Sequence, residues 1–487
     1  MPRAKDKGRS PPTRIAIVGG GISGLSTAYF LSQRLSRSQA EIILLETSSR
    51  WGGTILSERI GEFVLEGGPD SFVSHKPQAR ELCRKLGLEG RLVESQPLHR
   101  KSYLLSQGKL HALPPGLFSK PPLDQSGLVK TPLLSFRGRL RAALEPLIPS
   151  ANLEDESVTH FISRRLGREV AEKILEPLVV GIYGGDASAL SIRSTLPHLF
   201  EAERTCGRLT KTPFQLAKSL LQRMDPRKGA AGRKEEGNPL LSLQGGTAEL
   251  IEALLREINK RVDLRLDANV SLALALSHGF QIRIRREVWE DFDVLILATP
   301  AYVSAQILSK AFPPMAKLLE KIPYASAIIV SLAYDEDILA DRTGSGFLVT
   351  QSEKKTMAAC TWMSNKFPGR CRKGHALLRS FVGGDQARKW MSSDNGELVG
   401  RIKDELVEIL GIQKEPVSQK VYRWQNALPQ YQVGHHERTE RLSRDLNAVP
   451  GLYLVGNFLD GVGISDCIRH AERVSGEVTE ERHERTK

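Results

Sequence analysis

A glycine-rich run near the start of the chain has residue types and spacing that suit phosphate binding. It reads GGGISG and contains the pattern GxGxxG at Gly19, Gly21 and Gly24. Gly19 permits a tight turn, Gly21 lets the backbone approach a pyrophosphate, and Gly24 lets a helix pack on the preceding strand. The first turn of that helix offers N–H groups and a positive dipole end. We expect this run to hold a dinucleotide through Gly19, Gly20, Gly21, Ile22, Ser23 and Gly24.

Two apolar runs rich in β-branched residues flank this turn and must position it. RIAIV at 14–18 and EIILL at 41–45 both predict buried strands, with a helix between them. The second strand ends at Glu46, about twenty residues past the last glycine, where a ribose-binding carboxylate belongs. The alternative interpretation is an ordinary βαβ unit with a Gly-rich turn.

The residues after Glu46 favour one kind of dinucleotide. Arg50, Gly52 and Gly53 follow it, and the pattern Glu-x-x-x-Arg-x-Gly-Gly resembles the extended signature of the flavin amine oxidase superfamily. In that superfamily the arginine and the glycines line the phosphates of FAD, and we include Thr47 in the same set. The resemblance implies FAD rather than NAD. No cysteine stands where amine oxidases link their flavin, since Cys467 falls inside the expected final helix, so we expect the FAD to be non-covalent.

A second nucleotide-binding candidate lies at the other end of the chain. A strand at 452–455 and a Gly-Asn turn lead to Val462, Gly463 and Ile464, with Ser465 or Asp466 as the expected N-cap of a helix through about Val474. Backbone N–H groups at such a helix start stabilise negative charge on a reduced flavin. The alternative is a surface helix with a Gly-rich lead-in.

The pattern of elements predicts an α/β fold, α+β overall, with a Rossmann-like FAD-binding domain made of discontinuous segments. We expect a mixed-sheet substrate domain and a helical lobe beside it. The expected ranges are a flexible basic arm at 1–13, the FAD-binding domain at 14–95, 238–305 and 445–480, the substrate-binding domain at 96–123 and 306–444, the helical lobe at 124–224 and a flexible linker at 225–237.

Several longer blocks resemble the protoporphyrinogen/coproporphyrinogen III oxidase family, in its soluble bacterial branch. They are LEGGPDSF at 65–72, EPLVVGIYGGDASALSIRS at 176–194, RWQNALPQYQVGH at 423–435 and GNFLDGVGISDCI at 456–468. The resemblance implies that one loop passes beside the isoalloxazine ring, formed by Gly68, Pro69, Asp70 and Ser71. It implies that Val270 and Trp424 flank FAD, that Val462, Gly463 and Ile464 meet the flavin through the backbone, and that Lys101 lies near a substrate carboxylate.

The resemblance also implies an activity: FAD-dependent, oxygen-dependent six-electron oxidation of coproporphyrinogen III or protoporphyrinogen IX in haem biosynthesis, releasing hydrogen peroxide. The chemistry takes place at flavin N5, so no side chain is expected to be an obligate acid or base. The adjacent pair His435-His436 is expected in a loop near the flavin, as structural or surface residues. The sequence does not choose between the two porphyrinogens.

Composition limits the partners. The chain has 487 residues, a formal net charge of +13 and five cysteines without metal spacing. The charge suits anionic partners, including a carboxylate-bearing substrate, although much of it is ordinary surface. We expect a cytoplasmic enzyme with no metal, no nucleic acid and no transmembrane segment, and leave peripheral membrane contact and a homo-oligomer open.

Two other functions fit the same motifs. One is a different flavin oxidase, acting on an amine or an unsaturated lipid. The other is a non-catalytic protein that keeps FAD for stability while it binds or delivers a tetrapyrrole.

Overall fold

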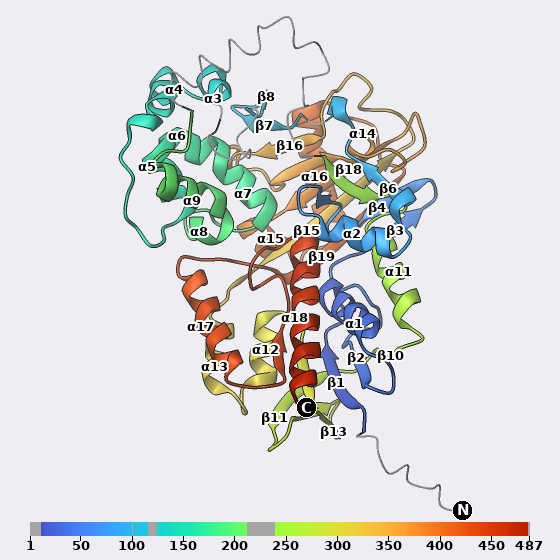
Figure 1. Cartoon of the computed structure of the whole chain (residues 1–487). Helices are drawn as coiled ribbons and strands as arrows, with labels where there is room; N and C mark the ends of the chain where they lie inside the picture. Colours follow the sequence, from blue (N-terminus) through green and yellow to red (C-terminus); the bar gives the residue numbers. More distant parts are fainter. Residues whose placement is uncertain (1–10, 100, 115–122, 124, 212–238, 486–487) are drawn as a thin grey trace, which may run out of the picture.

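The computed structural model describes residues 11–99, 101–114, 123, 125–211 and 239–485 (Figure 1). The expected linker at 225–237 and residues 1–10 of the expected basic arm lie outside the described residues. Among the described residues, no helix is long and apolar enough to cross a bilayer. The same residues contain no cluster of His, Cys, Asp or Glu that could hold a metal ion.

The glycine-rich turn belongs to a parallel sheet with the strand order β10-β2-β1-β14-β20. The strands are β1 (Thr13–Val18), β2 (Ala40–Leu45), β10 (Val262–Arg265), β14 (Val294–Leu297) and β20 (Leu452–Leu454). Their apolar runs are buried on both faces, as expected for a parallel sheet covered on both sides. The segments come from the start, middle and end of the chain, which confirms the predicted α/β fold with a discontinuous Rossmann-like domain.

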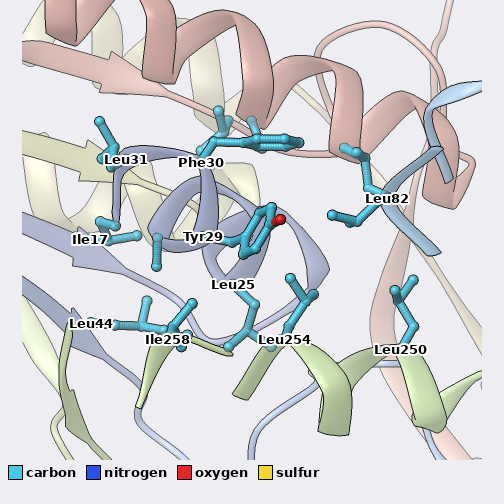
Figure 2. Packing of buried hydrophobic residues seen from close by; sticks show 14 of the residues in the cluster. Ile17, Leu25, Tyr29, Phe30, Leu31, Leu44, Leu82, Leu250, Leu254 and Ile258 are labelled. Carbon is cyan, nitrogen blue, oxygen red and sulfur yellow. The ribbon is translucent and has the colours of Figure 1, made fainter. Parts of the chain in front are cut away.

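Helices cover one face of this sheet, and Figure 2 shows their packing. Leu25 and Tyr29 of one helix share an apolar core with Leu250 and Leu254 of another and with Ile17 of the sheet. The helices are α1 (Ile22–Arg34), α2 (Gln78–Lys85), α11 (Ala248–Ile258) and α18 (Ile464–Arg485). Burial of these side chains fixes the glycine turn, because α1 begins directly after it.

The opposite face is covered by an antiparallel sheet and three helices that share a second apolar core. These elements are β11 (Val270–Ala275), β12 (Phe280–Ile284), β13 (Val288–Phe292), α12 (Ala301–Leu308), α13 (Pro313–Glu320) and α17 (His435–Asn447). Two small sheets complete the description of this part. One contains β3 (Ser57–Ile60) and β4 (Phe63–Glu66), and the other contains β5 (Phe72–Val73), β9 (Leu240–Leu243) and β6 (Leu92–Glu94).

A seven-stranded mixed sheet forms the second part of the molecule, in the order β19-β15-β18-β17-β16-β7-β8. Its strands are β7 (Tyr103–Ser106), β8 (Lys109–Ala112), β15 (Tyr324–Tyr334), β16 (Gly346–Val349), β17 (Ala359–Trp362), β18 (Ala376–Val382) and β19 (Ser418–Pro429). Its helices are α14 (Met363–Lys366), α15 (Gly384–Trp390) and α16 (Asn395–Leu410). The predicted mixed-sheet part is confirmed, since β16 and β7 are parallel while the other pairs are antiparallel.

The third part is a group of short helices around its own apolar core, drawn in teal and green in Figure 1. They are α3 (Ser126–Lys130), α4 (Phe136–Ala143), α5 (Val158–Leu166), α6 (Arg168–Val170), a π-helical turn (Ala171–Leu175), α7 (Glu176–Tyr183), α8 (Ile192–Thr195) and α9 (Pro197–Cys206). Tyr431 joins this core from the segment after β19, so the helical part packs directly on the mixed-sheet part.

Candidate functional site

The glycine turn leaves open backbone where a phosphate would lie. A Cβ on Gly19 would come 2.7 Å from the carbonyl oxygen of Ala298, and one on Gly24 would come 1.9 Å from that of Gly19. By contrast, a Cβ on Gly21 would meet only the Cα of Gly53, at 4.0 Å. Gly53 belongs to the second glycine pair, and a Cβ on it would come 3.2 Å from the Gly21 Cα, so the two glycine turns pack closely against each other. Among the described residues no side chain caps α1, whose N-cap is Gly21, so its first-turn N–H groups remain for a ligand.

Glu46 lies beside this turn, at the end of β2. One carboxylate oxygen accepts a hydrogen bond from the Gly20 N–H at 2.6 Å, and the other accepts from the N–H and hydroxyl of Ser48, both at 2.8 Å. The side chain is half-buried, so its remaining lone pairs can accept ribose hydroxyls. The Ala268 N–H donates to the Glu46 carbonyl at 2.8 Å, which brings the buried Val270 to the same side. Thr47 is exposed next to Glu46.

Arg50 contacts the backbone around the second glycine pair, Gly52 and Gly53. Its guanidinium donates to the carbonyl of Gly53, and also to that of Trp51 at 3.3 Å. It lies 5.6 Å from the ring centre of Trp424, on a strand of the mixed sheet. The Trp424 indole N–H donates to the Gly67 carbonyl at 2.6 Å. Arg50 and Trp424 therefore connect the glycine turns to the loop that begins at Gly67.

The loop containing Gly68, Pro69, Asp70 and Ser71 is held by ionic contacts that the sequence did not reveal. The Asp70 carboxylate lies 2.8 Å from the Lys366 ammonium and accepts from the Ser71 hydroxyl at 2.6 Å. Burial would raise the pKa of Asp70, but the charges of Lys366 and Arg379 outweigh this effect and hold the pKa well below its usual range. Arg379 also donates to the Gly68 carbonyl at 2.6 Å.

A second buried ion pair lies behind this loop. Glu66 and Arg370 have fully buried side chains 3.1 Å apart, and Glu66 also accepts from the Thr247 N–H at 3.1 Å and the Ser57 hydroxyl at 2.6 Å. Burial raises the pKa of Glu66, and the Arg370 charge opposes that rise. In each of these two ion pairs the partners are about 300 positions apart in the sequence. No local sequence pattern therefore predicts either pair.

The final helix approaches the glycine turn closely. Ser23 hydrogen-bonds the Cys467 thiol, and the Ser475 hydroxyl donates to the Thr27 carbonyl at 3.4 Å. Burial raises the pKa of Cys467 to about 11, so this thiol stays protonated at neutral pH. The first turn of α1 and the first turn of α18 therefore lie side by side.

The start of α18 differs from the sequence-based expectation. The helix begins at Ile464 and runs to Arg485, so Ser465 and Asp466 lie in its first turn and neither is the N-cap. Asp466 instead accepts from the Gly463 N–H at 3.3 Å and pairs with Lys76 at 2.8 Å. A first-turn carboxylate interacts favourably with the positive helix end, and Lys76 holds it there. Val462 packs against the helical core, while Ile464 is buried beneath α1.

The two family-like blocks in the middle of the chain meet in space. The Gln430 side chain donates to the Tyr183 carbonyl at 2.7 Å, and the rings of Tyr183 and Tyr431 lie 6.1 Å apart. Gly184 ends α7 with a left-handed φ of 64°. The next residue, Gly185, packs against the Gln430 side chain. These contacts join the helical part to the end of β19, the strand that also carries Trp424.

Three further residues that the sequence analysis singled out are Lys101, His435 and His436. Lys101 is exposed just before β7, which is separated from the Trp424 strand by four strands of the mixed sheet. His435 and His436 were expected in a loop but begin helix α17. His435 is buried and stacks on the Tyr431 ring at 4.2 Å, and burial lowers its pKa to about 4. His436 is half-buried and lies 3.1 Å from Glu440.

The geometry of two glycine turns, a ribose-side carboxylate and a converging helix agrees with a family match over most of the chain. Residues 22–479 match the model of the flavin containing amine oxidoreductases. The chain belongs to this family. It is therefore a flavin-containing oxidoreductase, and the expectation of a flavin cofactor is confirmed.

Individual relatives are similar to the chain over nearly its full length. The chain is 31% identical to the coproporphyrinogen III oxidase of Bacillus subtilis (strain 168), with 93% of this chain and 95% of the relative covered. It is 28% identical to protoporphyrinogen oxidase 1, chloroplastic, of Arabidopsis thaliana, covering 97% and 89%. A crystal structure from Exiguobacterium sp. 255-15, provisionally named a protoporphyrinogen oxidase, is 29% identical, with a TM-score of 0.81 and coverage of 97% and 100%. The resemblance seen in the sequence blocks is confirmed by these full-length similarities.

Proposed function

We propose that the chain oxidises a porphyrinogen to the corresponding porphyrin in haem biosynthesis, with coproporphyrinogen III favoured over protoporphyrinogen IX. The observation that carries this proposal is the 31% identity to a coproporphyrinogen III oxidase across 93% of the chain. The contact between Gln430 and Tyr183 supports it, because it unites the two sequence blocks that distinguish this family from amine-acting relatives.

The cofactor that fits the site is FAD, held without a covalent bond. The space beside Gly21, where an added Cβ would touch only the Gly53 Cα, suits a pyrophosphate; Glu46 suits a ribose and Val270 the adenine side. Arg50 adds the positive charge that phosphates need, and the protonated Cys467 thiol gives no nucleophile for a flavin linkage. When bound, FAD accepts a hydride from a methylene bridge of the substrate at N5.

The chain's own residues bind and orient in this proposal. The first turn of α1 neutralises the phosphates, and the first turn of α18, with Val462, Gly463 and Ile464, stabilises negative charge on the pyrimidine ring. The backbone of Gly68 to Ser71 would line the isoalloxazine, while the Asp70 side chain is engaged by Lys366. Trp424 would flank the ring system. Lys101 remains a proposed contact for a substrate carboxylate.

The reaction removes six electrons and six protons from the porphyrinogen in three two-electron steps. Each step reduces one O₂ to H₂O₂, so three molecules of each balance the equation. We assign the cofactor to the ranges 14–95, 238–305 and 445–480, the substrate to 96–123 and 306–444, and the cover of the substrate site to the helical part at 124–224.

The experiment is one assay of the purified yellow protein with both porphyrinogens under air, following porphyrin fluorescence and hydrogen peroxide. We expect fluorescence growth with at least one substrate, faster with coproporphyrinogen III, and peroxide in proportion. A folded, yellow preparation that oxidises neither would reject the proposal. Anaerobic bleaching of the flavin by an amine would instead support the amine oxidase alternative.

The cofactor assignment has a separate test with a matched control. Glu46→Gln keeps the shape of the side chain but removes the charge that favours ribose hydroxyls, so we expect the FAD dissociation constant to rise at least about tenfold. Glu41→Gln changes an exposed carboxylate on the same strand, paired with Arg14 at 3.1 Å, and should bind FAD normally. Titration of the apoprotein by flavin fluorescence quenching measures both. Equal affinities would contradict the assignment.

A further inference from the structure

One face of the mixed sheet has middle residues that the neighbouring apolar cores do not include. Leu348 of β16 packs on the helical core, and Leu377 of β18 lies in a small core beside β4. Alternate residues of a strand share a face, so Arg379 and Phe381 of β18 lie on the same side as Leu377. Thr361 of β17 is the partner of Arg379 across the ladder. Thr361, Arg379 and Phe381 are all half-buried.

Arg379 reaches from this face to the loop that begins at Gly67. Its Nε donates to the Glu66 carbonyl at 3.2 Å, and its Nη2 donates to the Gly68 carbonyl at 2.6 Å. Its Nη1 donates to no described residue and is not enclosed by the protein. The two N–H groups of Nη1 are therefore left without an acceptor in the described part of the chain.

The charge of Arg379 is also the one that the loop leaves without an ion pair. Lys366 lies 2.8 Å from Asp70, and the buried Arg370 lies 3.1 Å from Glu66. Among the described residues no carboxylate forms an ion pair with Arg379, although its charge acts on the nearby Asp70. A half-buried guanidinium without an ionic partner favours an anion that a ligand brings.

The surroundings of Arg379 favour a carboxylate on an apolar frame. Phe381 lies two residues further along the same face, and the end of α7 approaches it, because a Cβ on Gly184 would come 3.6 Å from the Phe381 ring. A guanidinium is planar and matches the geometry of a carboxylate. The phosphates of FAD are proposed at the glycine turns, away from this face. The anion that meets Arg379 is then part of the substrate.

We propose that Arg379 binds a carboxylate of the porphyrinogen and thereby fixes which methylene bridge faces the flavin. This inference rests on the proposed function, which places the isoalloxazine beside Gly68 to Ser71. Because the same guanidinium holds the Gly68 carbonyl, one side chain anchors both the substrate and the loop that lines the cofactor. Removal of its charge weakens the binding of tetrapyrroles that carry carboxylates and leaves the binding of esterified tetrapyrroles unchanged.

The first experiment measures binding without turnover. The FAD-loaded protein is titrated in one detergent buffer with coproporphyrin III, which carries four carboxylates, and with its tetramethyl ester, which carries none. Porphyrin fluorescence gives both dissociation constants. For Arg379→Gln we expect the dissociation constant of the acid to rise about tenfold, the size typical of one lost charged hydrogen bond, and that of the ester to stay at the wild-type value.

Two further variants complete the comparison. Arg379→Lys keeps the positive charge and should recover part of the lost affinity for the acid. The matched control is Arg372→Gln, which changes an arginine just before β18 whose side chain is 69% exposed and lies 3.7 Å from Glu62. It should bind both probes as the wild type does.

Thr361→Asp tests the same charge if Arg379→Gln fails to fold or to hold FAD. It leaves the bonds from Arg379 to Glu66 and Gly68 in place and sets a carboxylate directly across the ladder. Opposite charges in such a cross-strand pair attract each other. The new carboxylate therefore competes with the substrate, and we expect weaker binding of the acid with unchanged binding of the ester.

The outcomes separate the role of Arg379 from the function of the chain. If Arg379→Gln binds the acid as tightly as the wild type does, the role is wrong while porphyrinogen oxidation stands. Equal losses for acid and ester would also overturn it, because Arg379 would then act only through the loop. A yellow wild type that binds neither probe and oxidises neither porphyrinogen would reject the proposed function together with the role of Arg379.

Discussion

Gly21 and Gly24 belong to one motif but differ in what an added methyl group would meet. Gly21 has an ordinary φ of −75° and open space, so Gly21→Ala should change apoprotein stability by less than about 0.5 kcal/mol. The methyl group would fill the space proposed for the pyrophosphate, and we expect FAD affinity to fall at least about tenfold. Thermal unfolding of the apoprotein and FAD titration measure the two effects.

Gly24→Ala serves as the comparison. Its methyl group would lie 1.9 Å from the Gly19 carbonyl oxygen, so α1 must shift away from β1. We expect a loss of about 2 kcal/mol or more in the free energy of unfolding, before any cofactor is added. If instead the two variants lose stability equally and bind FAD alike, the open space at Gly21 has no role in binding.

We expect the ion pair between Asp70 and Lys366 to contribute to the free energy of unfolding, and we expect that contribution to depend on pH. Both side chains are only 11% exposed, so Lys366→Met leaves a buried carboxylate without its main partner and should cost about 3 kcal/mol at pH 7. The folded state holds the Asp70 pKa low, so its ionisation stabilises the fold above the unfolded pKa of about 3.9 and that contribution is lost as pH falls.

Asp70→Asn has no such group to protonate, so it should lose less stability than the wild type when the pH falls from about 5 to 3. Chemical denaturation at a series of pH values measures the difference. Parallel loss in both proteins would show that the Asp70 charge is not stabilised by the fold.

At the scale of elements, the sequence was informative where the signal was local. The strands at 14–18 and 41–45 and the turn between them were predicted because apolar runs and glycine spacing act over a few residues. The start of α18 was placed wrongly because Lys76, nearly 400 positions away, holds Asp466 in the first turn rather than at the cap. The partners of Asp70 and Glu66 were not predictable, since only the folded sheets bring them together.

The junction between α7 and β19 gives a prediction at the same scale. Gln430 is buried and its amide satisfies the Tyr183 carbonyl at the end of α7. Gln430→Leu removes that donor and leaves a buried carbonyl unpaired, at a cost of about 1–3 kcal/mol. We expect faster amide hydrogen exchange in α7, measured by mass spectrometry, with unchanged exchange in α11, which packs on the other part of the molecule. Uniform acceleration in both helices would indicate global destabilisation instead.

For the whole molecule, the proposed FAD site depends on segments from both ends of the chain. β1 and β20 belong to one sheet, and α1 packs against α18, so a ligand at this site stabilises segments that are more than 400 residues apart. A ligand that binds only the folded state adds about 2.7 kcal/mol at a hundredfold excess over its dissociation constant. We therefore expect added FAD to raise the temperature at which the amides of α1 and α18 together lose their protection against hydrogen exchange. Added NAD should leave that temperature unchanged. If FAD shifted the protection of α1 but not that of α18, the final helix would not belong to the cofactor site, because a ligand held by both must stabilise both.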